Sequence, residues 1–324
     1  LFPYTTLFRS VETRDIHQFI YVAERICGIC SFGHSLGYAE TVESLMGVEV
    51  PRRAQYLRVI LHELSRVHSH LLWLGLAADA FGFESLFMHC WRLRERVLDI
   101  FEATTGGRVI LSYVQIGGVV RDIDADTLRW ICDKLDSIEG EYKEICATFL
   151  KDSSVRSRLD GVGYLSQQQA SELCMVGPFA RASNVPYDCR VLGHGAYGEL
   201  SDFTPITSTG GDCLARVEVR CAEVNQSIAI VKELAAKIPN DGIGEKSKLK
   251  PAAGAQACNV LEQPRGECYY YALGNGSANL ERMRMRTPTT QNLAGMVKAL
   301  EGCDLADVPN IILTIDPCIS CSER

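Results

Sequence analysis

Four long segments of the chain carry apolar residues at spacings of three and four, the pattern of helices that bury one side. A glycine pair ends the second segment and a proline stops the fourth. The expected helices begin after Pro51, run from about Phe87 to Thr104, begin after Asp124 or Asp126, and run from about Asp212 to Pro239. These segments predict a four-helix bundle core at about residues 51–239.

The pattern changes after the fourth helix. Glu267–Leu273 and Leu280–Arg286 flank a Gly-Asn-Gly turn, and methionines alternate with arginines in the second run, so we predict a β-hairpin. Asn310–Ile315 is mostly apolar and predicts a short strand that delivers the chain end. The expected fold class is therefore α+β and predominantly helical, with a small antiparallel β-sheet in a β-rich part at about residues 255–324.

Two other stretches bear on domain organisation. Gly161–Gly211 is rich in Gly, Pro, Ser and Asp and too long for a simple connector, which favours a functional or interface role. The first ten residues, LFPYTTLFRS, are unlike the rest of the chain and resemble the translation of a sequencing-library adapter. We interpret residues 1–10 as an artefact, with a native strand as the alternative. Residues 11–324 are then expected to form one domain whose native N-terminus lies upstream.

Composition excludes some functions. The net charge of −7 argues against a general nucleic-acid-binding protein, which needs a cationic surface. No run approaches the roughly 18–20 apolar residues that cross a bilayer, so any membrane link is expected to come through partner subunits.

Fourteen cysteines suggest a disulfide scaffold, but the chain is long, is expected to lack a secretory signal and scatters most cysteines singly. A reducing compartment fits better, and the single cysteines are expected to be small buried hydrophobic residues. These are Cys90, Cys132, Cys146, Cys174, Cys213, Cys221 and Cys258.

Two CxxC pairs stand at opposite ends of the usable sequence and offer four thiolates to one metal centre: Cys27 with Cys30, and Cys318 with Cys321. A Cys₄ zinc site has this ligand count, although structural zinc usually joins small local units. An iron–sulfur cluster also takes four thiolates, although its common patterns keep three cysteines close together. A buried redox metal suits thiolates from distant chain ends, because the fold must close before the site exists.

The segments around the pairs carry a family resemblance. RICGICSFGH at 25–34 and DPCISCSER at 316–324 resemble the first and last metal-binding signatures of [NiFe] hydrogenase large subunits. EQPRGE at 262–267, GPFARAS at 177–183 and the Gly-Asp pair at 211–212 resemble the energy-converting, membrane-associated branch and its homologue, the 49 kDa subunit of complex I. The resemblance covers about residues 11–324.

The resemblance implies that Cys27, Cys30, Cys318 and Cys321 hold nickel, and that Cys30 and Cys321 also bridge to iron. The family's iron carries carbonyl and cyanide ligands, and an accessory magnesium or iron ion belongs to the same expectation. The implied reaction is the reversible interconversion of two protons and two electrons with dihydrogen. Cys318, as a terminal thiolate, is expected to take the proton.

Three neighbours of the cysteines have implied roles with plain alternatives. His34 is expected to donate a ring N–H to the bridging sulfur of Cys30, or is a structural histidine. Arg265 is expected to place its guanidinium over the cyanides, or lies in a surface turn. Glu24 fits a proton network and a surface ion pair equally.

The family's upstream signature, with an arginine, a glycine and an acidic residue, is missing from positions 5–8.

Expected partners are a small subunit carrying an iron–sulfur cluster, other complex I-like soluble and membrane subunits, and ferredoxin as electron donor, at the cytoplasmic side of the cell membrane. Two rival functions remain open. One is a complex I 49 kDa-type subunit contributing to a quinone site, which has no need of four thiolates. The other is a noncatalytic, zinc-stapled assembly scaffold.

Overall fold

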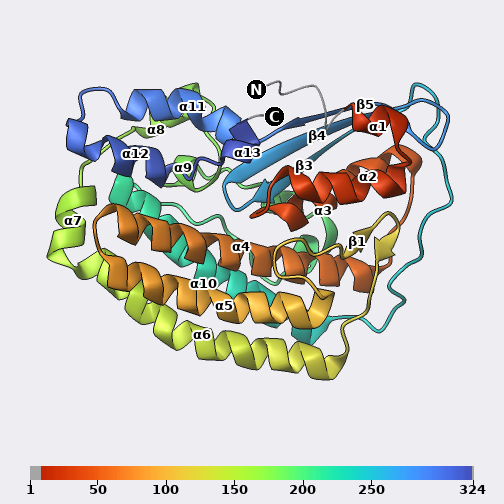
Figure 1. The fold of residues 1–324 in the computed structure, drawn as a ribbon, viewed down its shortest axis with the longest axis horizontal. Coiled ribbons are helices and arrows are strands. Elements are labelled where there is room, and N and C mark those ends of the chain that lie inside the picture. The colour runs from red at the N-terminus through yellow and green to blue at the C-terminus, as the bar shows by residue number, and fades with distance from the viewer. Residues whose placement is uncertain (1–8, 323–324) are drawn as a thin grey trace.

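The long helices of the chain pack against one another. The structure, a computed structural model, describes residues 9–322. In it α4 (Arg52–Ala80), α5 (Glu84–Thr105), α6 (Ala125–Lys151) and α10 (Cys213–Lys237) run side by side in the lower half of Figure 1. Helix α4 contacts α5 and α10, and α6 contacts the same two helices. The predicted helix-rich α+β class is confirmed.

The ends of these helices follow from local chemistry. Asp124 accepts a hydrogen bond from the backbone N–H of Thr127, and Asp212 accepts one from that of Ala215, so both aspartates are N-caps. Gly106 ends α5 in the left-handed region at φ 83°. The predicted ranges of these helices are therefore right to within a few residues.

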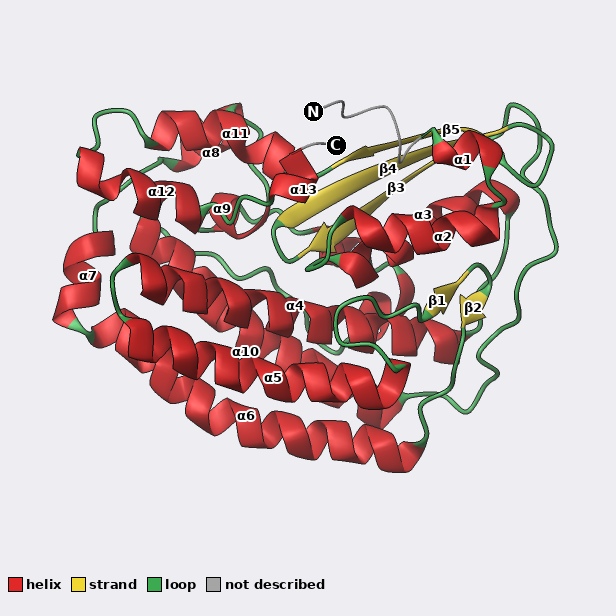
Figure 2. Cartoon of the chain, in the orientation of Figure 1, coloured by secondary structure: helices red, strands yellow, loops and turns green. Residues whose placement is uncertain are grey.

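A three-stranded antiparallel sheet lies above the helices (Figure 2). Its strands, in spatial order, are β3 (Gln256–Gln263), β4 (Gly266–Gly274) and β5 (Leu280–Arg286). The pairing of β4 with β5 confirms the predicted hairpin, whereas β3 was not predicted. A second, two-stranded sheet joins β1 (Val114–Gln115) and β2 (Gly118–Val119).

Helix α3 (Ser31–Met46), which the sequence patterns did not reveal, separates the sheet from the long helices. It is buried almost all round, so it lacks the one-sided stripe by which amphipathic helices are recognised. Gly37 lets it approach β4, because a Cβ there would lie 2.3 Å from the Tyr270 ring. This contact brings the start of α3 beside the β3–β4 turn.

The prediction of a strand at Asn310–Ile315 is wrong, because these residues belong mainly to helix α12 (Val308–Thr314). A six-residue segment with four apolar residues does not distinguish a buried strand from a short buried helix. Pro309 in the first turn favours the helix. Trp73 of α4 donates an indole N–H to the carbonyl oxygen of Leu313 at 2.7 Å, which anchors α12 before the final CxxC pair.

The remaining elements are short. They are α1 (Ser10–Thr13), α2 (Ile16–Ala23), η1 (Glu24–Ile26), α7 (Ser153–Leu159), α8 (Gln167–Glu172), α9 (Gly177–Arg181), η2 (Cys189–Leu192), η3 (Gly195–Glu199), α11 (Pro288–Ala299), η4 (Leu305–Asp307) and α13 (Ile319–Ser322). The loop-rich stretch 161–211 thus contains four of these helical segments. Among the described residues, no helix combines the length and apolar character that a bilayer crossing requires.

Two sequence interpretations need comment. The adapter-like residues 1–10 lie outside the described residues except for the last two. The expectation that the scattered cysteines are buried holds for Cys90, Cys213 and Cys221, but it is wrong for Cys174 and Cys258, which are exposed. Cys258 lies on the outer side of a sheet, where alternate residues face solvent.

Candidate metal centre

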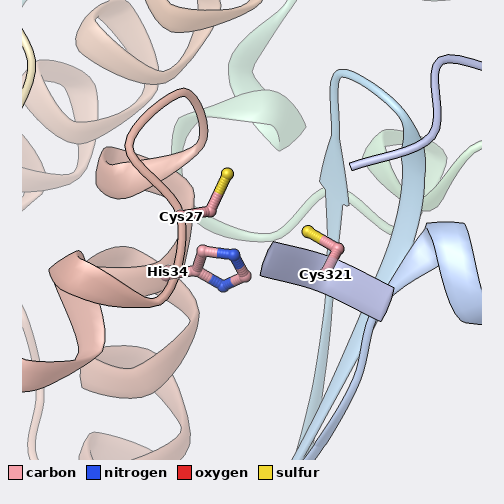
Figure 3. Close-up of side chains that lie close together, drawn as sticks. All are labelled: Cys27, His34 and Cys321. Carbon is pink, nitrogen blue, oxygen red and sulfur yellow. The ribbon is translucent and has the colours of Figure 1, made fainter. Parts of the chain in front are cut away.

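The two CxxC pairs meet although nearly the whole chain separates them. Cys27, Cys30, Cys318 and Cys321 form one buried cluster, with Cys318 the most exposed at 8%. The Sγ atoms of Cys27 and Cys318 lie 3.5 Å apart. The first pair occupies the turn between η1 and α3, and the second begins just before α13. In Figure 3 the sulfur atoms of Cys27 and Cys321 and the ring of His34 face a common space.

Threonines at the start of α11 hold the second CxxC pair in place. Thr289 Oγ1 accepts the backbone N–H of Cys318 at 3.2 Å, and Thr287 Oγ1 donates to the carbonyl of Cys321 at 2.6 Å. Both threonines are buried. The pair is therefore positioned by its backbone, which leaves the sulfur atoms free to bind a metal. The sequence patterns held no sign of these contacts.

Arg265 links both cysteine pairs from the turn between β3 and β4. Its Nη1 lies 3.2 Å from Cys30 Sγ and 3.3 Å from Ser69 Oγ. Its Nη2 donates to Asp316 Oδ1 at 2.7 Å, and its Nε donates to the Asp316 carbonyl at 3.0 Å. Because Arg265 is buried, the alternative of a surface turn residue is excluded.

Asp316 adopts the left-handed region at φ 61°, an uncommon conformation for a residue other than glycine. Both its carbonyl and its carboxylate accept hydrogen bonds from Arg265. These bonds stabilise the turn that presents Cys318. These hydrogen bonds thus offset the free-energy cost of the left-handed backbone conformation.

His34 lies in the first turn of α3 and is buried. Its Nδ1 lies 3.0 Å from Tyr270 Oη and 3.3 Å from Gln263 Nε2. Both contacts involve Nδ1, so Tyr270 and Gln263 occupy that nitrogen of the ring. Nε2 is buried without a protein partner, which makes it the nitrogen available to the sulfurs.

The structure groups a ring nitrogen of His34 with the sulfurs of Cys27 and Cys321, all within 4.8 Å of one another. The sequence had suggested Cys30 as its acceptor instead. Either of two roles fits this geometry: Nε2–H donates to a thiolate, or the nitrogen itself binds a metal.

The electrostatics of the cluster favour bound cations. Hydrogen bonds from the thiols of Cys30, Cys318 and Cys321 lower the pKa of Cys27, so a thiolate is stabilised there even without metal. More thiolates in this space would repel one another unless a metal cation joined them. Soft sulfur donors select soft or borderline metals such as nickel, iron and zinc.

Glu24 lies in η1, three residues before Cys27, and is only 1% exposed. Its Oε2 accepts a hydrogen bond from Ser112 Oγ at 2.9 Å, and its Oε1 is buried without a partner. Burial raises its pKa. Arg25 instead donates to the carbonyl of Tyr21. The surface ion pair considered from the sequence is therefore absent, and a buried hydrogen-bond network remains.

A buried network of charges supports the β3–β4 turn from behind, and sequence reasoning missed it. Arg66 donates to the carbonyls of Glu262 at 2.5 Å and Gln263 at 3.2 Å, and also contacts Glu63. Glu63 and Arg66 are fully buried on α4. Their opposite charges at a spacing of three residues in one helix were the available signal. Such a network is held by mutual pairing, since an unpaired buried charge is costly.

Burial of α4 also determines how acid affects stability. Burial first, and then the charge of Arg66, lower the pKa of His62 to about 3. The folded state therefore keeps His62 neutral, whereas the unfolded chain takes up a proton near pH 6.5. The stability that depends on a neutral His62 is present above pH 6.5 and is lost as the pH falls from 6.5 towards 3.

We predict that His62→Gln reduces the fall in unfolding free energy below pH 6.5 by up to about 1.4 kcal/mol per pH unit. The measurement is urea denaturation of the purified chain at several pH values between 7.5 and 5. Substitution of the exposed His194 by Gln is the control and should leave the slope unchanged. Parallel pH dependence in wild type and His62→Gln would contradict the prediction.

Comparison with known proteins identifies two matching families and several relatives. The family model of the respiratory-chain NADH dehydrogenase 49 kDa subunit matches residues 80–254 and 245–324, and the model of nickel-dependent hydrogenases matches residues 8–76. The chain is 39% identical to the membrane-bound hydrogenase subunit alpha of Pyrococcus furiosus, over 96% of this chain and 76% of that protein. It is 36% identical to the carbon monoxide-induced hydrogenase of Rhodospirillum rubrum, over 96% of this chain and 86% of that protein.

A solved structure has the same fold. A chain in the membrane-bound sulfane sulfur reductase, an archaeal respiratory membrane complex, superposes with a TM-score of 0.93 and 30% sequence identity. The match covers 99% of this chain and 88% of that one. The described elements therefore form an arrangement already seen in a subunit of a membrane-bound complex.

Proposed function

The chain belongs to the energy-converting, complex I-related branch of the [NiFe] hydrogenase large subunits, and on this premise we propose that it is a catalytic hydrogenase subunit. The proposed reaction is the reversible reduction of two protons by two electrons to dihydrogen. The observation that carries the proposal is the buried cluster of four unbridged cysteines from both ends of the chain.

The residues present fit a nickel–iron centre. Cys27, Cys30, Cys318 and Cys321 would hold nickel, with Cys30 and Cys321 also binding iron, and the centre would supply reversible splitting of dihydrogen. The unpartnered Nε2 of His34 and the Nη1 of Arg265 place donors beside the sulfurs. Such donors stabilise negative charge on thiolates in a site that excludes water.

Cys318 Sγ is the proton-holding atom in this proposal. It is the most exposed of the four thiols, and the neighbouring Ile319 is 81% exposed, so the second pair lies closest to the surface. Glu24 is a candidate for passing protons from the first pair, since its carboxyl is buried and bonded to Ser112. Cys318 and Glu24 are thus the two proton acceptors of this proposal.

Assembly is part of the same proposal. Relatives of this chain are subunits of membrane-bound complexes, so we propose peripheral attachment to the cytoplasmic side of the membrane through partner subunits. A small subunit with an iron–sulfur cluster would carry electrons, with ferredoxin as donor. All four clustered cysteines are used by the metals, which is why the electron carrier lies in another chain.

We predict that the mature protein contains nickel and iron in equal amounts and shows infrared bands of carbonyl and cyanide. The reason is the donor set: four thiolates with a histidine and an arginine donor beside them. Elemental analysis and infrared spectroscopy of the purified complex test it. Zinc in stoichiometric amount without nickel would favour the scaffold, and Cys27, His34 and Cys321 could hold it. Full assembly without any metal would favour a complex I-type quinone role.

A further inference from the structure

The outer face of the three-stranded sheet carries tyrosines and arginines in register. On the inner face Tyr270 packs against Gly37 of α3, and its neighbours in the sheet are buried. The residues of the outer face alternate along the strands with those of the inner face and are partly or fully exposed. We call it the arginine–tyrosine face, and it consists of Tyr269, Tyr271 and Leu273 of β4 opposite Arg286, Arg284 and Arg282 of β5.

The charge of this face is opposite to that of the whole chain. Arg286 pairs with Glu267, but within residues 9–322 neither Arg282 nor Arg284 has an ion-pair partner. Both are exposed. The exposed carboxylate of Glu281 next to Arg282 lowers the local charge without reversing it. A chain of net charge −7 thus presents a positive face on its sheet.

Exposed aromatic and apolar side chains also lie near the sheet outside this face. Tyr187 donates its hydroxyl to Glu267, the carboxylate that also pairs with Arg286, and its side chain is 41% exposed. Segment η2, which contacts β3, exposes Val191 and Leu192 by 58% and 59%. Exposed apolar residues beside arginine and tyrosine are typical of protein–protein contact surfaces.

The chemistry of the face favours a protein carboxylate over a lipid or nucleic acid. Arginine and tyrosine are the residues enriched at the energetic centres of protein interfaces, and guanidinium binds carboxylates through two parallel hydrogen bonds. The face contains no lysine, and three arginines fall short of the four to eight basic residues typical of anionic lipid binding. Alternate residues of an extended acidic segment would match the spacing of the arginines along β5.

We propose that the arginine–tyrosine face binds an acidic segment of another subunit of the complex. The proposal rests on the proposed function only in placing the chain within a multisubunit complex, and it does not depend on the metal centre. Arg284 lies in the middle of the face, paired with Tyr271 across the strands and between Arg282 and Arg286 along β5, so we expect it to contribute most.

The test is purification of the complete complex through a tag on this chain, with Arg284→Glu compared to wild type. Arg129→Glu is the matched control, since Arg129 is 77% exposed on α6, away from the sheet. We expect Arg284→Glu to retain one subunit at least about tenfold less well, equal to about 1.4 kcal/mol, because reversed charges repel. Arg284→Lys should retain an amount of the subunit between those of wild type and Arg284→Glu. The wild-type contact should weaken as the salt concentration rises.

Nickel content and thermal midpoint measured on the same samples separate loss of docking from misfolding. Equal retention of every subunit in Arg284→Glu and wild type would overturn the proposal. If Arg284→Glu instead retained all subunits but lost binding to phosphatidylcholine vesicles containing phosphatidylglycerol, the face would be a lipid-binding surface. That result would also overturn the proposal. Absence of nickel from all variants, with the expected subunit loss, would reject the hydrogenase function while supporting this interface.

Discussion

Replacing Cys318 with serine is expected to abolish hydrogen–deuterium exchange, to below about one thousandth of the wild-type rate, or about 4 kcal/mol of lost stabilisation of the transition state. Serine oxygen is a harder ligand than thiolate and does not deprotonate as readily, so both metal binding and proton acceptance fail. The Sγ of Cys318 also contacts that of Cys27, so its loss disturbs the opposite pair. Exchange and nickel content are measured on the purified complex.

Cys90→Ser is the matched control for that substitution. Cys90 is fully buried on α5, and burial raises its pKa to about 12, so it is a neutral thiol outside the cluster. We expect a loss of stability of about 1–3 kcal/mol from the buried hydroxyl, with exchange per nickel unchanged. The half-buried Cys146 should behave similarly. Wild-type exchange per nickel in Cys318→Ser would remove the nickel assignment.

Arg265→Lys is expected to retain about one tenth to one hundredth of wild-type turnover per nickel, a loss of roughly 1.5–3 kcal/mol. The lysine would keep the charge but not the planar fork, which contacts Cys30, Ser69 and Asp316 at once. Nickel content should change little, because Arg265 is not a ligand and Thr289 still holds the backbone of Cys318. Hydrogen-dependent turnover of the complete complex is the measurement.

Arg58→Lys controls for the general cost of replacing a buried arginine. Arg58 pairs with Glu43 at 2.6 Å and is as buried as Arg265, but it contacts none of the four cysteines. It should therefore lower stability and leave turnover per nickel unchanged. If Arg265→Lys turns over like wild type, its role is limited to holding Asp316 and the turn before Cys318.

The sequence was a reliable guide where a local pattern has one physical cause. The four long helices were predicted from apolar spacing and from caps such as Asp124 and Asp212, and the β4–β5 hairpin from alternation around a glycine turn. Prediction failed where the local pattern is ambiguous. Helix α3 is buried almost all round, and Asn310–Ile315 is too short and too largely apolar to distinguish helix from strand.

The residues of the candidate site were likewise predictable only in part. The CxxC spacing identified all four cysteines, because two thiolates separated by two residues can turn towards one metal wherever the chain places them. Their supporting residues were not identifiable. Ser69, Thr289 and Tyr270 are common residues in ordinary helices and strands, and only their positions in space give them a role.

By itself, then, the sequence determined the long helices, the hairpin and the chemistry of the four thiols, since each depends on residues close together in the chain. Tertiary structure alone decided that Arg265 reaches across to Cys30 and Asp316, and that Gln263 occupies Nδ1 of His34 and leaves Nε2 without a protein partner. These are hydrogen bonds between residues tens to hundreds of positions apart. Such contacts form only when packing brings the elements together, and they leave no periodic pattern along the chain.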